Sequence, residues 1–157
     1  PFAAYFTRGT GHDEYARYSE DNEAWAKNLI RLHKKTELTR DVLPQPVIDR
    51  MKDAKIAIVS YGTNDAPIAE ARDLLQAQGV KTDYLRIRAL PLAHTIHDFI
   101  NEFDHVYVVE NNLDAQMTQI IRMDMPEKAD RILPINMCDG LPLTARFISE
   151  TLLEMEG

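Results

Sequence analysis

The stretch TRGTGHDE, which begins at residue 7, brings flexible backbone and polar side chains together close to the start of the chain. The backbone amides of such a turn, together with a guanidinium, can hold a phosphate or a carboxylate. The spacing fits neither the dinucleotide-binding fingerprint nor the phosphate-binding P-loop. The alternative is a tight turn in which the glycines permit positive φ and the polar groups meet a neighbouring domain. The residues concerned are Arg8, Gly9, Thr10, Gly11 and His12.

A second candidate is the sequence SYGTNDA at residues 60–66, where a predicted strand leads into a predicted helix. Open α/β sheets bind ligands at the carboxyl ends of their strands, and a helix N-terminus favours anions. Gly62, Thr63 and Asn64 therefore form a weak anion-site candidate, weak because the stretch has one glycine and no lysine. The alternative is a purely structural turn.

A third candidate is VVENNLDAQ at residues 108–116, where four polar residues follow a predicted strand. Polar side chains that converge at a strand end indicate a functional edge or a polar interface. A lone carboxylate without a second acid, a nucleophile or a base does not make a catalytic centre. We therefore assign no catalytic residue and expect this edge to meet a partner domain or subunit, with helix capping as the alternative. The edge residues are Glu110, Asn111, Asn112 and Gln116.

Three histidines and one cysteine complete the set of reactive side chains. His94 and His97 are three residues apart, but no further ligand has suitable spacing, so we expect surface histidines, His105 included, and no metal site. Cys138 lies in a strand-to-helix turn without an evident histidine base, which argues against a catalytic thiol. A single cysteine also excludes an internal disulfide and any cysteine-based zinc or iron–sulfur site within this chain.

Length, composition and charge indicate a globular protein. The 157 residues are 45% hydrophobic and 27% charged, which suits one ordinary domain with a core and an additional arm. The first fifty residues are balanced in charge, so the net charge of −7 belongs to residues 51–157. An acidic domain without a basic stripe argues against a nucleic-acid partner. We expect a cytoplasmic protein without a membrane span, and the start at Pro1 within apparent structure suggests a piece of a longer chain.

Residues 51–157 alternate between predicted strands and predicted helices. Buried strands are predicted at residues 55–62, 80–88, 105–110 and 130–136. The helices are expected to begin at Asn64 or Asp65, at Thr95, at Asp114 and at Pro142, with Leu74, Ile120 and Met155 among the inward residues. This order, with short connections, predicts a three-layer α/β/α domain whose mostly parallel sheet is covered by helices on both sides.

The first fifty residues do not follow that pattern, so we expect an arm at residues 1–50 and the α/β domain at residues 51–157. SEDNEAWAKNLIRLHKK predicts one amphipathic helix, capped near Ser19 or Asp21, and VLPQPVID reads as a proline-stiffened connector. A single helix cannot bury its own apolar face, so the arm must pack on the α/β domain or on another chain. The apolar residues are Trp25, Leu29 and Leu32.

Several ordered segments together resemble the C-terminal region of the alpha subunit of 2-oxoacid:ferredoxin oxidoreductases, the 2-oxoglutarate type most closely. The segments are YFTRGTGHDEYARYSEDNEAWAKNLIRLHKKTEL, LPQP, AIVSYGTNDAPIAEARDLLQAQGVKTDYLRIRALPLA and VYVVENNLDAQMTQIIR, which together cover nearly the whole chain. The resemblance implies that residues 51–157 are a domain like the C-terminal domain of transketolase. It implies that residues 1–50 are the arm that joins this domain to a pyrimidine-binding domain.

The resemblance also implies an activity for the complete enzyme. Such enzymes oxidatively decarboxylate a 2-oxoacid on thiamine diphosphate with Mg²⁺, transfer the acyl group to coenzyme A, and pass electrons through [4Fe–4S] clusters to ferredoxin. The cofactors and cluster ligands would belong to other domains and to the beta subunit, so this chain would be a non-catalytic scaffold and interface domain. Arg8 and His12 would then face the pyrimidine-binding domain or the beta subunit, or the loop would help to seat coenzyme A phosphates.

Two competing interpretations remain. One is a free-standing α/β protein that binds a small anion at the edge formed by residues 60–66. The other is an independent enzyme with Glu110 or Cys138 as catalyst, which lacks the supporting groups that either residue would need.

Overall fold

The structure, a computed structural model, describes residues 11–157 and divides after Arg40 into two compact units. We call them the N-terminal unit (residues 11–40) and the sheet unit (residues 41–157). The division falls before the boundary expected at residue 50, because the connector after Arg40 belongs to the sheet unit. None of the helices within residues 11–157 is long and apolar enough to span a membrane.

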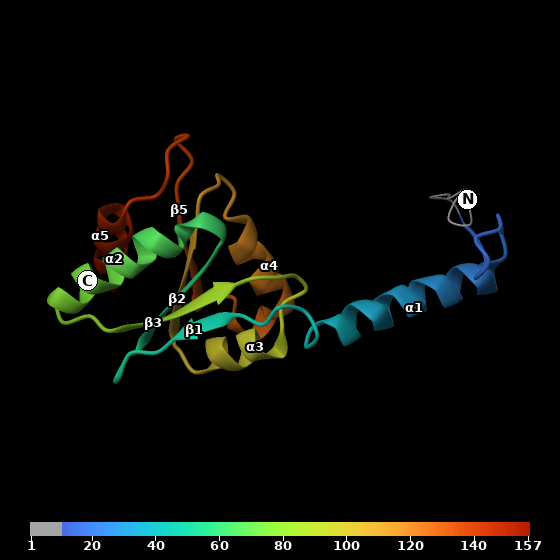
Figure 1. Ribbon diagram of the computed structural model, residues 1–157, viewed down its shortest axis with the longest axis horizontal. Helices are drawn as coiled ribbons and strands as arrows, with labels where there is room; N and C mark the ends of the chain where they lie inside the picture. The colour runs from blue at the N-terminus through green and yellow to red at the C-terminus, as the bar shows by residue number, and fades with distance from the viewer. Residues whose placement is uncertain (1–10) are drawn as a thin grey trace. The chain divides into compact units, whose positions relative to one another are not determined.

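The N-terminal unit consists of a tight turn followed by helix α1 (Asn22–Thr39), drawn in blue in Figure 1. The side chain of Asp21 accepts a hydrogen bond from the backbone N–H of Ala24 at 2.7 Å, so Asp21 is the N-cap, as one of the two expected positions. No residue of α1 is buried within the structure. The apolar face therefore has no cover in its own unit, and three of its residues are about half exposed. They are Trp25 (52%), Leu29 (51%) and Leu32 (48%).

The sheet unit is built on a five-stranded sheet in the order β1-β3-β2-β4-β5. The four strands β2 to β5 run parallel, and β1 pairs antiparallel with the edge of β3 (Figure 1). Four strands match the predicted ones, whereas β1 lies in the segment that we expected to be only a connector. The strands are β1 (Val47–Asp49), β2 (Ile56–Tyr61), β3 (Thr82–Ile87), β4 (His105–Glu110) and β5 (Ile132–Asn136).

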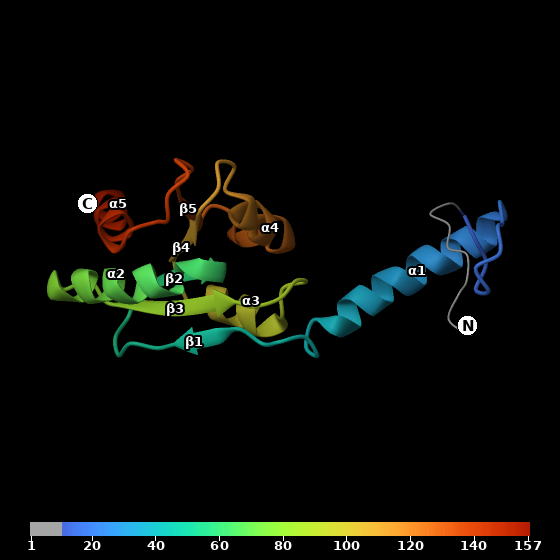
Figure 2. The same ribbon diagram turned by 45° about the horizontal axis from the view of Figure 1, so that its top comes forward.

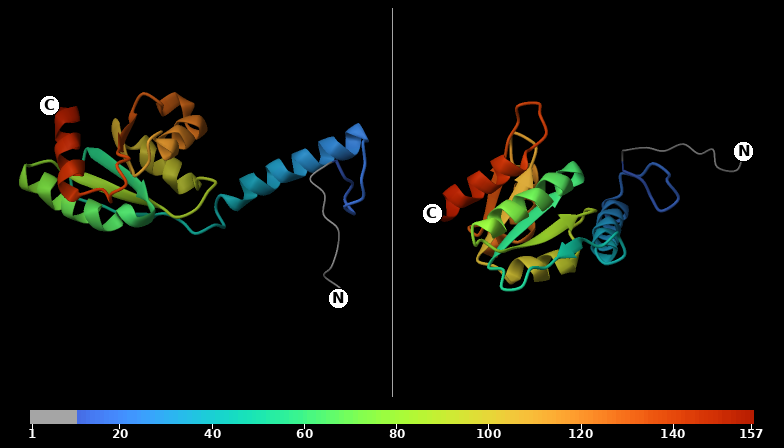
Figure 3. Two further views of the ribbon diagram at one scale, coloured as in Figure 1. Left: turned by 90° about the horizontal axis from the view of Figure 1, so that it is seen from above. Right: turned by 60° about the vertical axis from the view of Figure 1, so that its left-hand side comes forward.

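Helices cover both faces of this sheet, which confirms the predicted three-layer α/β/α fold. Helices α3 and α4 pack on one face, while α2 and α5 lie side by side on the other (Figures 2 and 3). Short 3₁₀ turns precede α2 and follow α4. The helices are α2 (Asp65–Ala77), α3 (His94–Asn101), α4 (Gln116–Asp124) and α5 (Ala145–Glu156), and the turns are η1 (Gly62–Asn64) and η2 (Pro126–Lys128).

The core has two parts because successive side chains of a strand point to opposite faces. On β3, Leu85 and Ile87 pack under α3 and α4, whereas Tyr84 packs under α2 and α5. Tyr107 of β4 and Phe99 of α3 are among the largest fully buried side chains. Full burial of a large apolar side chain stabilises a fold by about 1.5–3 kcal/mol, so this core gives the sheet unit its own stability.

Some of the helix predictions are wrong in detail. Three residues expected to face inward are partly exposed: Leu74 (39%), Ile120 (36%) and Met155 (41%). Arg72 is buried instead, because its guanidinium donates to the backbone oxygen of Thr82 at 3.0 Å and lies over the ring of Tyr84. A charged side chain can be buried when its donors are paired.

Three helix starts also differ from the expected ones. α3 follows Ala93, and Thr95 does not cap it but donates its hydroxyl to Oε1 of Gln45 at 2.7 Å. α4 begins after Ala115, whose positive φ of 50° ends the preceding loop, rather than at Asp114. α5 is capped by Thr144 and not opened by Pro142; the Thr144 hydroxyl accepts from the Phe147 N–H at 3.2 Å.

Candidate functional site at the carboxyl edge of the sheet

Glu110, the last residue of β4, forms the centre of the polar edge. The residue is fully buried, with an exposed fraction of 0%. Its carboxylate accepts hydrogen bonds from the backbone N–H groups of Met117 (2.7 Å) and Thr118 (3.0 Å), which are two of the first N–H groups of α4. The Thr118 hydroxyl (2.7 Å) and the Asn112 side-chain amide (2.7 Å) complete the set. The carboxylate thus acts as a cap at the positive end of a helix dipole.

This position corrects our expectation that Glu110 meets a partner. Both carboxylate oxygens are engaged inside the chain, so Glu110 contributes to the edge as an internal support. A buried charge is tolerated only when hydrogen bonds replace the lost water. Helix capping, the alternative that the sequence left open, is what the geometry shows for this residue.

Asn112 links Glu110 to the end of the neighbouring strand β2. Its amide also donates to the hydroxyl of Tyr61 at 3.2 Å, and its side-chain oxygen accepts from the N–H of Gln116 at 3.2 Å. Burial raises the pKa of Tyr61, the hydrogen bond from Asn112 partly opposes this, and the nearby Glu110 charge adds to it. Tyr61 therefore stays a neutral phenol. Asn111 and Gln116 are exposed, and Asn112 is half-buried.

Two further asparagines tie the strand ends together. Asn136, at the end of β5, donates to the backbone oxygens of Asn112 and Leu113, both at 3.0 Å. Asn64, which is buried, donates to the backbone oxygen of Val109 at 3.3 Å. Sequence reasoning missed Tyr61 and Asn136 as members of the edge. Their position at the ends of predicted parallel strands, Asn136 as the last residue and Tyr61 as the last but one, was the available signal, since parallel strands end at the same edge.

The turn at residues 60–66 is better explained by structure than by anion binding. Gly62 has a positive φ of 66°, a conformation that glycine adopts without steric cost. Arg86 donates to the Gly62 oxygen at 3.2 Å and pairs with Asp65 at 3.4 Å. Asp65 also accepts from the Tyr84 hydroxyl at 3.0 Å. The Asp65 carboxylate places a negative charge at the start of α2, where an anionic ligand would have to bind. Thr63 is exposed at this turn.

The opening loop is described only from Gly11 onward, so the expectations for Arg8, Gly9 and Thr10 lie outside the described residues. Ser19 donates its backbone N–H to Gly11 at 3.1 Å, and His12 pairs with Tyr18. A Cβ on Gly11 would lie 2.6 Å from the Ser19 oxygen and 3.4 Å from Cε3 of Trp25. Close approach of the backbone, rather than positive φ, therefore requires glycine at this position.

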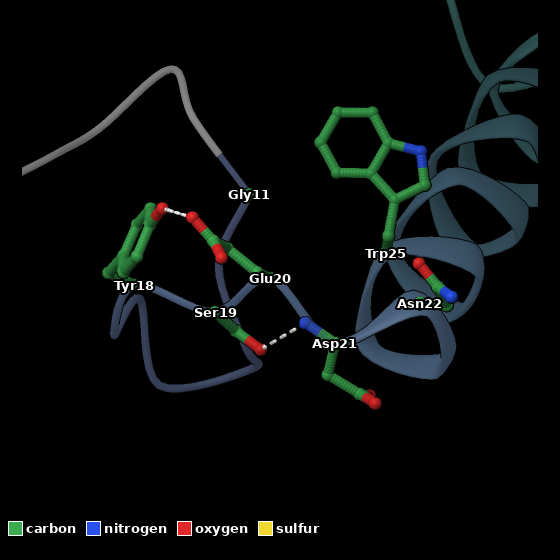
Figure 4. Close-up of a pocket in the computed structure, with 7 residues that line it drawn as sticks. All are labelled: Gly11, Tyr18, Ser19, Glu20, Asp21, Asn22 and Trp25. Carbon is green, nitrogen blue, oxygen red and sulfur yellow. Dashed lines mark hydrogen bonds between the residues drawn. The ribbon is translucent and has the colours of Figure 1, made fainter.

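The turn is secured from within and borders a shallow cavity. Asp13 accepts from the N–H groups of Tyr15 (2.9 Å) and Arg17 (3.0 Å), and Asn28 of α1 donates to the His12 oxygen at 2.5 Å. The cavity has a volume of about 430 Å³. Figure 4 shows Trp25 and Tyr18 on opposite sides of it. The Tyr18 hydroxyl donates to Glu20, so the acidic side chains here have partners within the turn. The lining residues are Gly11, Tyr18, Ser19, Glu20, Asp21, Asn22 and Trp25.

The three histidines of the sheet unit are each paired with a different carboxylate. His94 contacts Asp41 (2.9 Å) and His97 contacts Asp124 (2.7 Å). His105 contacts Glu156 at 2.6 Å, and the same Glu156 oxygen accepts from the Tyr107 hydroxyl at 2.7 Å. Within residues 11–157, no three His, Cys, Asp or Glu side chains gather as a group that could hold a metal ion. Cys138 is exposed with a free thiol.

The sequence comparisons identify relatives of much greater length. The chain is 28% identical over 141 residues to subunit alpha of 2-oxoacid:ferredoxin oxidoreductase 2 from Aeropyrum pernix. It is 30% identical over 125 residues to subunit alpha of 2-oxoacid:ferredoxin oxidoreductase 1 from the same organism. The matches cover 86% and 74% of this chain but only 22% and 19% of the relatives, so the chain spans about a fifth of their length. No protein-family model matches the chain.

The structural comparisons support the fold. The 2-oxoglutarate:ferredoxin oxidoreductase from Magnetococcus marinus, solved with 2-oxoglutarate, coenzyme A and succinyl-CoA bound, aligns with a TM-score of 0.80 and 22% identity. That match covers 98% of this chain and 27% of the solved one. A split-gene transketolase, in an inactive tetramer, aligns with a TM-score of 0.57 and 18% identity over 69% of this chain and 40% of that one. The predicted transketolase-like fold is confirmed.

Proposed function

We propose that this chain, which is homologous to part of the alpha subunits of 2-oxoacid:ferredoxin oxidoreductases, serves as a scaffold and interface domain of such an enzyme. Its own polar edge supports this role: the side chains that could have been catalytic brace the ends of the strands instead. Glu110 caps α4, and Asn112 and Asn136 join neighbouring loops. The domain would thus contribute shape and contacts, and the chemistry would take place elsewhere in the enzyme.

The observation that carries the proposal is the apolar face of α1, which has no cover within its own unit. Trp25, Leu29 and Leu32 follow one another at spacings of four and three residues, which places them along one side of a helix. Each is about half exposed. Isolated helices are marginal in water, and most helical stability in proteins comes from packing an amphipathic face. We infer that the beta subunit covers this face in the assembled enzyme.

In this proposal, the complete enzyme has the activity of the family. It would oxidatively decarboxylate a 2-oxoacid, of the 2-oxoglutarate class, and form the acyl-CoA with ferredoxin as electron acceptor. The bound molecules in the Magnetococcus marinus structure support that substrate class. Thiamine diphosphate, Mg²⁺ and [4Fe–4S] clusters would serve the complete enzyme. A cluster of this kind is commonly held by four cysteine thiolates, and this chain contains one cysteine, so its residues do not fit a cluster site.

The alternative of a free-standing anion-binding module is less well supported. Asp65 occupies the helix start at the 60–66 edge, and Arg86, the neighbouring cation, is already paired with it.

The proposal is tested by co-purification of the alpha and beta subunits with single changes on two neighbouring residues of α1. Leu29→Glu places a charge on the apolar face, whereas Ile30→Glu is the matched control, since Ile30 is equally exposed (55%) but points to another side of the helix. We expect Leu29→Glu to reduce recovery of the complex several-fold and Ile30→Glu to leave it unchanged. Equal recovery for both variants would reject the α1 face as the interface.

A further inference from the structure

Two loops stand side by side at the carboxyl edge of the sheet and are held to each other by hydrogen bonds. Residues 111–115 connect β4 to α4, and residues 137–144 connect β5 to α5; both rise together at the top of Figure 1. The Asn111 amide donates to the Leu141 oxygen at 3.0 Å, and the Asn136 amide donates to the Leu113 oxygen at 3.0 Å. We call this pair of loops the two-loop platform.

The platform is also anchored below. Met137 packs against the core and Leu143 is buried, so the second loop is fixed at both ends. Asp139 accepts from the Leu141 N–H at 2.9 Å and turns the loop upon itself. In the first loop, Asn112 connects to Gln116 and to the buried Glu110. The backbone of the platform is therefore preorganised by the interior of the domain.

The two-loop platform exposes two large apolar side chains to solvent. Leu113 is 74% exposed and Leu141 is 64% exposed. Single exposed leucines are ordinary on protein surfaces. Leu113 and Leu141 differ from such single leucines, because an asparagine side chain donates a hydrogen bond to the backbone oxygen of each and fixes its position. Rigid presentation lowers the entropy lost on association.

We propose that Leu113 and Leu141 of the two-loop platform dock into an apolar pocket of the beta subunit that is bordered by lysine or arginine. Asp114 and Asp139, both exposed, are the only charged residues in the two loops, so the platform itself carries a net negative charge. Complementary potentials favour a basic partner surface. A second copy of the chain would instead bring the same acidic residues together, which disfavours self-association.

This inference rests on the proposed function and names the partner chemistry of a second contact, separate from α1. It also revises the expected role of the polar edge. The asparagines and Glu110 hold the two-loop platform in place. The contact itself is made by the two leucines, which were not predicted from the sequence.

The direct test uses Cys138, which is exposed, lies in the platform and is the only cysteine of this chain. The alpha polypeptide is treated with a maleimide in two states, alone and assembled with the beta subunit. Mass spectrometry then follows modification of the peptide that contains Cys138. Because a thiol reacts only where reagent reaches it, we expect about tenfold slower modification in the assembled enzyme. Equal rates in the two states would overturn the proposal.

Variants identify the leucines as the anchors. We expect Leu113→Asp and Leu141→Asp each to weaken binding of the beta subunit about tenfold, because the apolar contact of the leucine is lost and a carboxylate would have to leave water for the apolar floor of the pocket. Met123→Asp is the matched control, since Met123 is 80% exposed on α4 but two turns away from the platform. Unchanged unfolding temperatures would show that the fold is kept.

Two other results would contradict the proposal. Affinity that is unaffected by both leucine changes would exclude them as anchors. Protection of Cys138 in the free alpha polypeptide as its concentration rises would show that a second copy covers the platform. Failure of the proposed function gives a different result. In that case Leu29→Glu would not affect assembly with the beta subunit, although Cys138 would still be protected.

Discussion

At the scale of single residues, Glu110 shows how a side chain of catalytic type can be wholly structural. It ends a buried strand, has no exposed surface, and accepts four hydrogen bonds from Asn112, Met117 and Thr118. Burial would penalise the charge, and these donors offset that penalty. The consequence is a fixed geometry for the loop between β4 and α4.

Replacement of Glu110 by glutamine tests this role. The glutamine amide would turn one acceptor into a donor, directed at donor groups of α4 or of Thr118, so buried polar groups would be left unpaired. We expect Glu110→Gln to lower the free energy of unfolding by about 1–3 kcal/mol, measured by urea denaturation. Glu127→Gln, at an exposed glutamate of η2, is the control and should change it by less than about 0.5 kcal/mol. Equal effects would contradict the capping role.

The sequence was sufficient to place Glu110 at the end of a strand, but not to show which way its carboxylate is used. That depends on the loop that follows: Ala115 adopts a positive φ and brings the N–H groups of Met117 and Thr118 back to the strand end. Positive φ in alanine has no sequence signal, since the residues that favour it are glycine, asparagine and aspartate. The same loop determines that Leu113 faces solvent.

At the scale of elements, the strands of the sheet unit were predictable because each is a short apolar run bounded by polar residues. The short edge strand β1 was not, because Pro44 and Pro46 mark its approach as a connector and only three residues pair with β3. The predicted inward face of α2 is wrong at one residue. Periodicity favoured Leu74, which is partly exposed, whereas Arg72 is buried because its guanidinium donates to the backbone oxygen of Thr82.

Arg50 connects three elements and makes a pH-dependent contribution to stability. Its guanidinium donates to Asp83 of β3 (2.8 Å) and to Glu102 after α3 (2.7 Å), and it lies over the Phe99 ring at 4.8 Å. The hydrogen bond from Arg50 lowers the pKa of Glu102 below its ordinary value of 4.5, and partial burial opposes the shift. A lowered pKa stabilises the fold above the ordinary value, and the contribution is lost as the pH falls through the lowered pKa.

We therefore expect Glu102→Gln to lower the free energy of unfolding near pH 7 by less than about 1 kcal/mol, because Glu102 is half exposed and the pair is screened. The difference from the unaltered chain should shrink as the pH falls below 4.5. Denaturation at a series of pH values measures it, with Glu70→Gln, an exposed glutamate of α2, as control. A difference that grows at acidic pH would refute the assignment.

At the scale of the whole molecule, the two units differ in how complete they are. The sheet unit has a core on both faces of its sheet, whereas α1 buries none of its residues. The sequence indicated an arm that needs a partner, because one amphipathic helix cannot enclose its own apolar face. It could not show the partner, since the surface that covers Trp25 and Leu29 lies outside this chain in our proposal.

Amide hydrogen exchange of residues 22–39 shows whether α1 is covered in the assembled enzyme. In the free alpha polypeptide, a helix without buried residues should open readily and exchange fast. We predict that assembly with the beta subunit slows exchange around Trp25, Leu29 and Leu32 by about tenfold or more, while β2 and β4 remain equally protected. If α1 exchanges at the same fast rate in the complete enzyme, the chain does not use this face as an interface, and the proposed role of α1 is wrong.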